Sequence, residues 1–331
     1  DTIECLESVF RSNYPNFQVI VCDNNSKDGS LDHIKAWAEG KINASSTEQH
    51  PLRRLSYPAV PKPIRYFQID QAQAESGKKS EEGVRLHIIA NKSNLGFAAG
   101  CNVGIRWALA QGNFDYIWLL NNDTVIEHDS LNYLINRIRE IPHAGMCGAT
   151  IISYHEPNKI QMPGGMGFNK WFAVPRPVKL TTNNPENIDP VAIESNLSYI
   201  SAACMLVSKE FLQEIGPMCE EYFLYFEEQD WMFRSHRRYR LSYEPRAIIY
   251  HKEGAAIGSN KDSKNRSFIS DYYGLRNRIL ITRKFFPFAL PIVYLGLIAT
   301  AFNRMLKGQW SRVWMIIKIL FCHKNNKHYE N

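Results

Sequence analysis

Tyr116-Ile-Trp-Leu-Leu-Asn-Asn-Asp-Thr124 is an apolar run that ends in polar residues. The five side chains at its start predict a short strand, and residues 130–140 behind it carry apolar side chains at helical spacing. In an open parallel sheet, ligands bind beyond the carboxyl ends of the strands. The polar residues after Leu120 are therefore candidates for a binding site.

Strands and helices alternate on both sides of this run. Residues 17–22 are nearly all apolar and rich in β-branched side chains, which is typical of a strand buried on both faces. The alternation predicts an α/β fold with a Rossmann-like, mostly parallel sheet flanked by helices. The other predicted elements are strands at 85–90, 199–207 and 247–251, helices at 30–38, 103–112 and 223–238, a small-residue turn at 94–100, and mostly loop at 151–198.

The chain has 331 residues, of which 44% are hydrophobic and 22% charged, as expected of a folded protein with a sizeable core. We expect one main domain in two parts, residues 1–125 and 126–283, followed by a tail at 284–331. Residues 41–85 are rich in turn formers and poor in periodicity, so they predict a partly mobile insertion.

The first residues predict a helix that starts at once. Asp1 precedes an acidic first turn and an apolar spacing typical of a helix, so Asp1 is the expected N-cap. Because a strand normally comes before such a helix in this kind of fold, we expect one before Asp1 and expect this chain to be truncated.

The tail combines apolar and basic residues. Residues 285–302 carry no formal charge but contain Pro287 and Pro291, which makes them borderline for a membrane span. The residues behind them, 310–321, place apolar side chains at helical spacing among Lys and Arg, as in a helix that lies in a bilayer interface. Packing of this helix in an ordinary core is the alternative.

Charge and cysteine content limit the partners. The formal charge is +6, and the late basic residues favour an anionic partner such as phospholipid; no nucleic-acid motif accompanies them. The seven cysteines are scattered, without a CxxC pair, which favours reduced thiols in a cytosol.

Four polar residues follow predicted strands. They are Asp23, Asn94, Asp123 and His251. Each alone is more often a turn or cap residue, but their coincidence at strand ends favours one site. A carboxylate is a natural ligand of Mg²⁺ or Mn²⁺, which makes Asp123 the first candidate. His251 would add a nitrogen ligand and favour Mn²⁺, unless it is a satisfied, half-buried histidine.

Glu227-Glu228-Gln229-Asp230 places three carboxylates at the start of a predicted helix. Close carboxylates in a partly apolar setting raise at least one pKa, which suits a general base. The alternative is structural, since acidic residues are favoured in any first helical turn and Asp230 with Arg234 forms an i,i+4 pair.

Five motifs in this order resemble glycosyltransferase family 2, especially its bacterial rhamnosyltransferase-like members. The resemblance covers roughly residues 1–283 and includes Tyr272-Tyr-Gly-Leu-Arg-Asn-Arg. The motifs are Val21-Cys-Asp-Asn-Asn-Ser, Asn94-Leu-Gly-Phe-Ala-Ala-Gly-Cys-Asn, Leu120-Asn-Asn-Asp-Thr, Phe223-Leu-Tyr-Phe-Glu-Glu-Gln-Asp-Trp and Tyr250-His-Lys-Glu-Gly.

The resemblance implies a GT-A fold and a role for each matching residue. Residues 1–125 would bind a nucleotide-sugar and residues 126–283 the acceptor. Asn121 replaces the first acid of the family's DxD motif, and Glu228 stands where the family usually has Asp. The implied donor contacts are Asp23, Asn25, Asn94, Gly96 and Asn122; the metal ligands are Asp123 and His251; Glu228 is the base, with Glu227 and Asp230 orienting the acceptor or supporting the base.

The implied activity is inverting transfer of a sugar from a nucleotide diphosphate with Mn²⁺ or Mg²⁺. By resemblance, dTDP-rhamnose is the first donor to consider, and a glycan or lipid-linked acceptor in cell-surface polysaccharide synthesis would fit. The enzyme would be cytoplasmic and peripheral on the inner face of a bacterial cell membrane. Two alternatives stay open: a membrane-associated scaffold or sugar-binding module with a degenerate site, and a nucleotidyltransferase.

Overall fold

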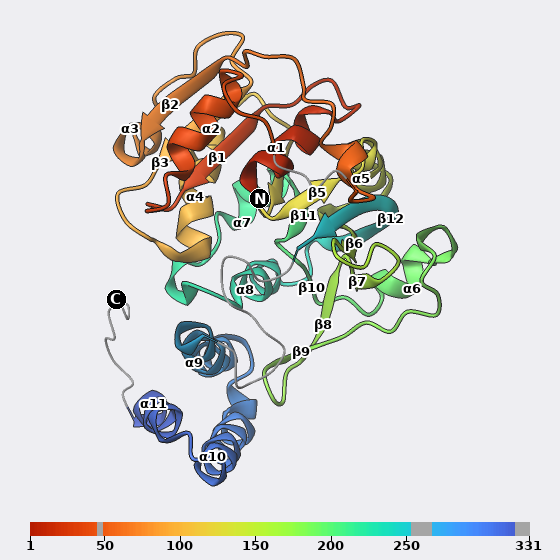
Figure 1. The fold of residues 1–331 in the computed structure, drawn as a ribbon. Coiled ribbons are helices and arrows are strands. Elements are labelled where there is room, and N and C mark those ends of the chain that lie inside the picture. Colours follow the sequence, from red (N-terminus) through yellow and green to blue (C-terminus); the bar gives the residue numbers. More distant parts are fainter. Residues whose placement is uncertain (45–48, 253–266, 322–331) are drawn as a thin grey trace.

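The computed structural model describes residues 1–44, 49–252 and 267–321. Two main sheets and a small antiparallel sheet of three strands form the body of the molecule with their helices, and three helices at the carboxyl end lie beneath it (Figure 1). The predicted α/β class and the helical tail are confirmed. Residues 322–331 of the tail and Glu253-Gly254 of the last motif lie outside the described residues.

The smaller sheet is fully parallel, as predicted. Its three strands are ordered β1-β3-β2, and their register places Asp23, Ala90 and Asp70 level with one another at the carboxyl edge. Side chains of β3 alternate between two helical layers: Leu86 and Ile88 pack with Trp37, and Ile89 packs with Trp107. The elements are β1 (Val19–Asp23), α2 (Ser30–Ala38), β2 (Tyr66–Asp70), α3 (Gln71–Glu75), β3 (Leu86–Ala90) and α4 (Gly96–Gln111).

Part of the segment predicted as an insertion is regular. It contains η1 (Arg53–Leu55), the strand β2, and α3, which Asp70 and Gln73 begin with a capping box. The buried carboxylate of Glu7 accepts hydrogen bonds from Trp37 Nε1, Val60 N and Lys62 Nζ, and so ties this segment to the body. The strand is short and has polar Gln68 at its centre, which hides it from a periodicity argument.

The larger sheet is mixed. Its order is β4-β11-β6-β12-β5, with β7 paired to β6, and among the described strands only β6 and β12 pair in parallel. The prediction of a mostly parallel sheet is thus wrong for this part, because apolar runs reveal burial but not strand direction. The strands are β4 (Tyr116–Leu120), β5 (Thr124–Ile126), β6 (Ala144–Ser153), β7 (Ile160–Pro163), β11 (Cys204–Ser208) and β12 (Arg240–His251).

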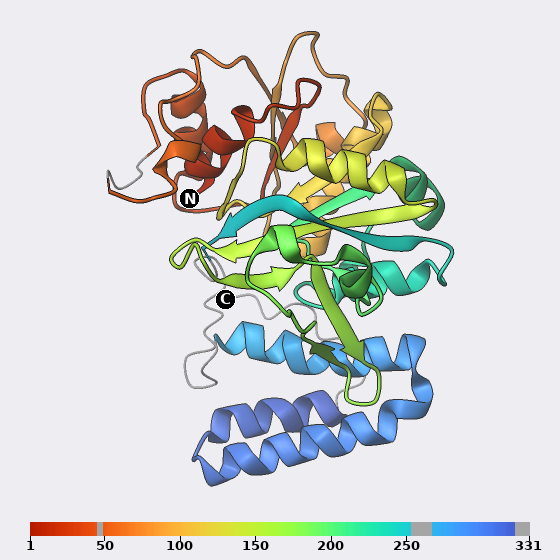
Figure 2. The same ribbon diagram turned by 90° about the vertical axis from the view of Figure 1, so that its right-hand side faces the viewer.

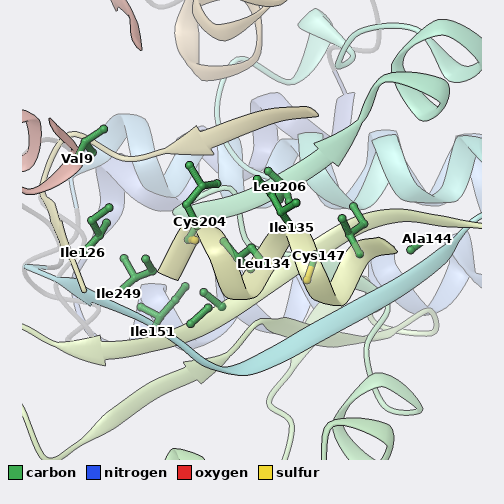
Figure 3. Close-up of a cluster of buried hydrophobic side chains, with 14 of the residues drawn as sticks. Val9, Ile126, Leu134, Ile135, Ala144, Cys147, Ile151, Cys204, Leu206 and Ile249 are labelled. Atoms are coloured by element: carbon green, nitrogen blue, oxygen red, sulfur yellow. The ribbon is translucent and has the colours of Figure 1, made fainter. Parts of the chain in front are cut away.

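Helices cover both faces of this sheet. On one face, α1 (Thr2–Phe10) and α5 (Ser130–Glu140) pack on sheet residues such as Cys147, Cys204 and Ile249, all fully buried (Figure 3). On the other, α7 (Lys209–Ile215) and α8 (Glu227–Arg234) contribute Phe211 and Trp231 to a second cluster. Burial on both faces explains why β6 and β11 consist of apolar and small residues.

Several predicted elements differ in extent. The strand predicted at 199–207 is broken at 201–203, and the helix predicted at 223–238 covers only 227–234. Helix α1 has Asp1 at its N-cap, but the Asp1 carboxylate binds Lys252 instead of capping the helix. The loop predicted at 151–198 contains β7, β8 (Gly165–Asn169), β9 (Val174–Arg176), η2 (Pro185–Asn187) and α6 (Pro190–Glu194); β10 (Tyr199–Ile200) pairs with β8, and η3 (Glu220–Tyr222) precedes α8.

Three helices form a bundle at the carboxyl end: α9 (Phe268–Phe285), followed in the tail by α10 (Leu290–Leu306) and α11 (Trp310–Phe321), with η4 (Pro287–Ala289) before α10. Helix α9 lies between the body and the hairpin of α10 and α11 (Figure 2). Asp271 on α9 is almost fully buried and accepts from Arg304 Nη2 at 2.7 Å and Arg312 Nη1 at 2.6 Å. These two ion pairs attach both helices of the hairpin to α9.

Helix α4 begins earlier than predicted, at Gly96, where it meets the segment before α8. Gly96 has φ +80°, and Phe97 N donates to Phe223 O at 2.7 Å. A Cβ added at Gly96 would lie 2.5 Å from Phe223 O and 2.6 Å from its ring. Both the backbone conformation and the close approach therefore require glycine at this position.

We expect Gly96→Ala to destabilise the protein more than Gly112→Ala at the other end of α4. Both glycines have nearly the same φ, +80° and +81°, but the nearest atom to a Gly112 Cβ is 3.9 Å away. The left-handed conformation costs each alanine about 1–2 kcal/mol. The clash adds about 1–3 kcal/mol at Gly96 only. Urea unfolding measures both free energies, and equal losses would contradict this account.

Candidate active site

Asp123 and His251 meet at the edge of the larger sheet. Asp123 lies in the turn between β4 and β5, and His251 is the last residue of β12, opposite Thr124 in the β5–β12 ladder. His251 Nε2 lies 3.2 Å from Asp123 Oδ1, and Lys252 N donates to Asp123 O. The ladder thus brings together the two predicted metal ligands.

The Asp123 side chain favours the ionised state. Burial tends to raise its pKa, but the hydrogen bond and charge of His251 outweigh burial and leave the pKa lower than usual. The part of the chain that the structure describes contains no group of three His, Cys, Asp or Glu side chains that could hold a metal. A cation at this pair would therefore need ligands beyond these two side chains.

Glu227 and Glu228 begin α8. Glu228 is half-buried, and its Oε1 accepts from Ala202 N at 3.3 Å. Glu227 is 3% exposed, and its Oε2 has no hydrogen-bond partner among the residues that the structure describes. Burial raises the pKa of both carboxyl groups, and the charge of Glu228 raises that of Glu227 further. Both carboxyl groups therefore hold a proton more readily than an exposed glutamate does.

Asp230 occupies a different place. It is fully buried, and its oxygens accept from Tyr222 Oη, Arg234 Nε and Lys284 Nζ at 3.0, 2.7 and 2.5 Å. The bond from Lys284 joins α8 to α9, which lies next to it (Figure 1). Of the two roles predicted for Asp230, this position favours support of the base over contact with the acceptor; either role stays a prediction.

The predicted donor residues gather after β1 and β3. Asp23 is 8% exposed, and its Oδ2 accepts from Ser26 N, so it also shapes the turn after β1. Asn25 has φ 64°, and its Oδ1 accepts from Lys27 Nζ. Asn94 Oδ1 accepts from Gly96 N at 3.0 Å, at the start of α4.

Asn24 connects these segments and was not predicted as a site residue. Its Nδ2 donates to Gly96 O at 2.8 Å, and its Oδ1 accepts from Asn91 Nδ2 at 3.0 Å. One side chain thus joins the ends of β1 and β3 to the start of α4. Its place between Asp23 and Asn25 in the first motif was the sequence feature that could have identified it.

Asn122 points to the start of the chain, since its Nδ2 donates to Thr2 Oγ1 at 2.9 Å. The donor contacts proposed for Asp23, Asn25, Asn94, Gly96 and Asn122 all remain predictions, because none of these contacts to a donor is observed. What the structure adds is their local geometry.

Residues 201–203, between β10 and β11, were also missed. Ala202 N binds the Glu228 carboxylate at 3.3 Å, while the neighbouring Ala203 O accepts from Asn121 N at 3.1 Å. Adjacent residues therefore hold the candidate base and the turn that carries Asp123. The small side chains of Ser201, Ala202 and Ala203 inside an apolar run were the available signal.

Hydrogen bonds and short stretches of chain link these segments. The links run from Asn24 to Gly96, from Phe97 to Phe223, along the chain to Glu228, through residues 201–203 to Asn121, and along the turn to the Asp123–His251 pair. The segments that carry the donor, base and metal candidates are thus connected to one another.

Comparison with known proteins gives two relatives that are both named as sugar transferases. The chain is 24% identical over 251 residues to the low-salt glycan biosynthesis hexosyltransferase of Haloferax volcanii, covering 72% of this chain and 71% of that protein. It is 27% identical over 157 residues to the N-acetylglucosaminyl-diphospho-decaprenol L-rhamnosyltransferase of Mycobacterium tuberculosis, covering 45% of this chain and 50% of that protein. The aligned part thus spans only half of the mycobacterial relative.

A solved structure and a family model complete the comparison. The mannosyltransferase PcManGT of Pyrobaculum calidifontis, in complex with GDP-Man and Mn²⁺, superposes with a TM-score of 0.50 at 13% identity, over 98% of this chain and 84% of that one, which supports the GT-A fold. The model of glycosyl transferase family 2 matches residues 2–49 and 69–216, more than half of the chain. The chain therefore belongs to glycosyl transferase family 2, as its motifs predict.

Proposed function

We propose that this protein is an inverting, metal-dependent glycosyltransferase that moves a sugar from a nucleotide diphosphate to a glycan or lipid-linked acceptor. The observation that carries the proposal is the series of contacts that joins the Glu228 carboxylate to the Asp123–His251 pair through residues 201–203. A base and a cation site in one region are what a direct displacement on a sugar diphosphate requires.

The residues present suit a divalent cation. An ionised carboxylate and an imidazole nitrogen 3.2 Å apart form a mixed oxygen and nitrogen donor set, which accommodates Mn²⁺ well and Mg²⁺ less well. A cation held there would offset the negative charge of the diphosphate leaving group. The Pyrobaculum mannosyltransferase, which was solved in complex with GDP-Man and Mn²⁺, supports a divalent metal in this fold.

Glu228 is the proposed base. Its ionised carboxylate accepts the proton of an acceptor hydroxyl, whose oxygen forms a bond to the anomeric carbon while the bond from that carbon to the diphosphate oxygen breaks. The bonding electrons leave with the nucleoside diphosphate, and a single displacement inverts the anomeric carbon. Glu227, which is buried with one unpartnered oxygen, would orient the acceptor or support Glu228.

The relatives guide the choice of substrates. The mycobacterial relative is named as an L-rhamnosyltransferase acting on a lipid-linked sugar, so dTDP-rhamnose is the first donor to test and a polyprenyl-linked glycan the first acceptor. The Haloferax relative is named only as a hexosyltransferase of glycan biosynthesis. We propose a role in the synthesis of cell-surface polysaccharide on this basis.

We expect Glu228→Gln to lower kcat by about 10²- to 10⁴-fold, the usual contribution of a general base. The matched control is Glu221→Gln, an exposed carboxylate just before α8. Release of dTDP from dTDP-rhamnose measures turnover, and pyrophosphate as product would instead indicate a nucleotidyltransferase. Equal kcat for both variants would refute Glu228 as the base.

The pH dependence of the wild type gives a second test. Because burial raises the pKa of Glu228, wild-type kcat should fall as the pH drops through a value above the usual Glu range.

We also propose that the tail binds a membrane surface. Large apolar side chains are exposed along η4, α10 and α11 and at the β8–β9 turn, where the ring of Trp171 lies 5.2 Å from that of Phe288. The exposed set on the tail is Phe288, Leu295, Ile298, Phe302, Met305, Leu306, Trp310, Trp314 and Phe321. Many exposed large apolar side chains on neighbouring helices favour an interaction site.

The ion pairs of Asp271 favour a helix that lies on the membrane. Among the described residues, the segment from Pro287 to Leu306 is the one helical stretch long and apolar enough to span a bilayer. Only 17% of its apolar stretch of 18 residues is buried in the protein. Spanning would separate Arg304 from Asp271, and breaking a buried ion pair costs about 3–5 kcal/mol. We therefore propose that α10 stays on α9 and inserts only its exposed face, next to anionic lipid on the cytoplasmic side.

We expect the triple variant Leu295→Ser, Ile298→Ser and Phe302→Ser to lower binding to phosphatidylglycerol vesicles by about 100-fold or more. Each apolar side chain contributes roughly 1.5–3 kcal/mol when it leaves water. Val191→Ser is the control, because Val191 on α6 is 64% exposed, like Leu295 at 65%. Co-sedimentation measures the partition; wild-type protein that stays in the supernatant would refute the proposal.

A further inference from the structure

The segment just before α8 has an unfavourable backbone. Phe223, Tyr225 and Phe226 have φ values of 59°, 67° and 77°, although none of them is glycine. Bulky residues rarely adopt this conformation, so the surroundings must hold it in place. We call residues 222–226 the strained turn.

A buried amide on α9 helps to hold the strained turn. Asn277 on α9 is fully buried, and its Nδ2 donates to Tyr222 O at 2.9 Å, Leu224 O at 2.9 Å and Tyr225 O at 3.0 Å. Its Oδ1 accepts from Arg276 Nη1 at 2.8 Å, which fixes the orientation of the amide. Without this donor, the carbonyl groups of Tyr222, Leu224 and Tyr225 would each lose a hydrogen bond.

Two more residues on the same face of α9 contact the turn. Tyr273 stacks on Phe223 with ring centroids 4.7 Å apart, and Ser270 Oγ lies 2.7 Å from Tyr225 Oη. Residues 270, 273 and 277 are spaced as i, i+3 and i+7, so they form one stripe along the helix. The turn is therefore shaped by α9 on one side and by Gly96 at the start of α4 on the other.

The strained turn determines where the candidate base lies. Phe226, its last residue, is the N-cap of α8, and Phe226 O accepts the first helical hydrogen bond from Asp230 N. Glu227 and Glu228 follow immediately, so a movement of the turn moves both carboxylates. A displacement of about 1 Å at such a group costs an enzyme about 100-fold in rate.

We propose that Asn277 is a positioning residue for the acid pair Glu227 and Glu228, which it places through the strained turn. It has no contact with the reacting groups itself. The inference rests on the proposed function as far as Glu228 is the base, but its structural part does not depend on any substrate. A side-chain amide suits this position because an ionised carboxylate cannot donate and an apolar side chain offers no donor.

The test compares Asn277→Asp with Thr282→Val in the full chain. Aspartate keeps the size of the side chain but removes the donors. Thr282 is equally buried on the same helix, and its Oγ1 bonds only within α9, to Arg278 O. Hydrogen exchange by mass spectrometry follows the peptide 221–232 without substrate, and release of dTDP from dTDP-rhamnose with Mn²⁺ gives kcat and KM.

In Asn277→Asp, we expect exchange in 221–232 to become at least about 10-fold faster and kcat to fall about 10- to 100-fold, with the donor KM changed less than about threefold. In Thr282→Val, exchange in this peptide and kcat should stay as in the wild type. Loss of kcat with retained KM separates positioning from a general loss of folded protein.

Unchanged exchange in Asn277→Asp, or an equal increase in Thr282→Val, would overturn the proposal. If Asn277→Asp does not fold, Tyr225→Phe is the variant to measure, because it removes only the hydroxyl group that faces Ser270 Oγ. Faster exchange in 221–232 of this variant supports the proposal, and exchange as in the wild type overturns it. A fully active Glu228→Gln would refute the base alone, because the exchange result stands without it.

Discussion

The pairing of β5 with the carboxyl end of β12 is the constraint on which the site depends. It places Thr124 opposite His251, and thereby brings Asp123 within 3.2 Å of the imidazole. The neighbouring loop 201–203 then ties this edge of the sheet to α8, since it binds both Asn121 and Glu228. Two short backbone connections therefore bring a potential cation site and a potential base into one region, although their residues are far apart in the sequence.

Helix α9 extends this arrangement to the tail. Its inner stripe shapes the turn before Glu227, while Asp271 near its start binds Arg304 of α10 and Arg312 of α11. The same helix thus contacts the acidic start of α8 and the hairpin whose outer face is apolar. An acceptor with a lipid tail would need its sugar at the base while its lipid stays in the bilayer, and a rigid link between the two surfaces suits that geometry.

Local patterns predicted much of this fold from the sequence. The strands around residues 17–22, 85–90 and 116–120, the helix at 130–140 and the polar residues at strand ends were all predictable, because burial and periodicity are local properties. The direction of β5 and β11 was not, since an apolar run is the same in either direction. The contacts of Asn24, Ala202 and Asn277 were equally hidden, because each links segments that only the tertiary structure brings together.

The central claim is that Asp123 and His251 together seat a cation that holds a nucleotide diphosphate. Thermal unfolding of the wild type, Asp123→Asn and His251→Ala with dTDP, with and without Mn²⁺, tests it most directly, since a ligand at 100 times its Kd stabilises the folded state by about 2.7 kcal/mol. We expect dTDP to raise the Tm of the wild type by several degrees only when Mn²⁺ is present, and we expect either substitution to remove the effect. Stabilisation that needs no Mn²⁺, or that persists in both variants, would contradict it.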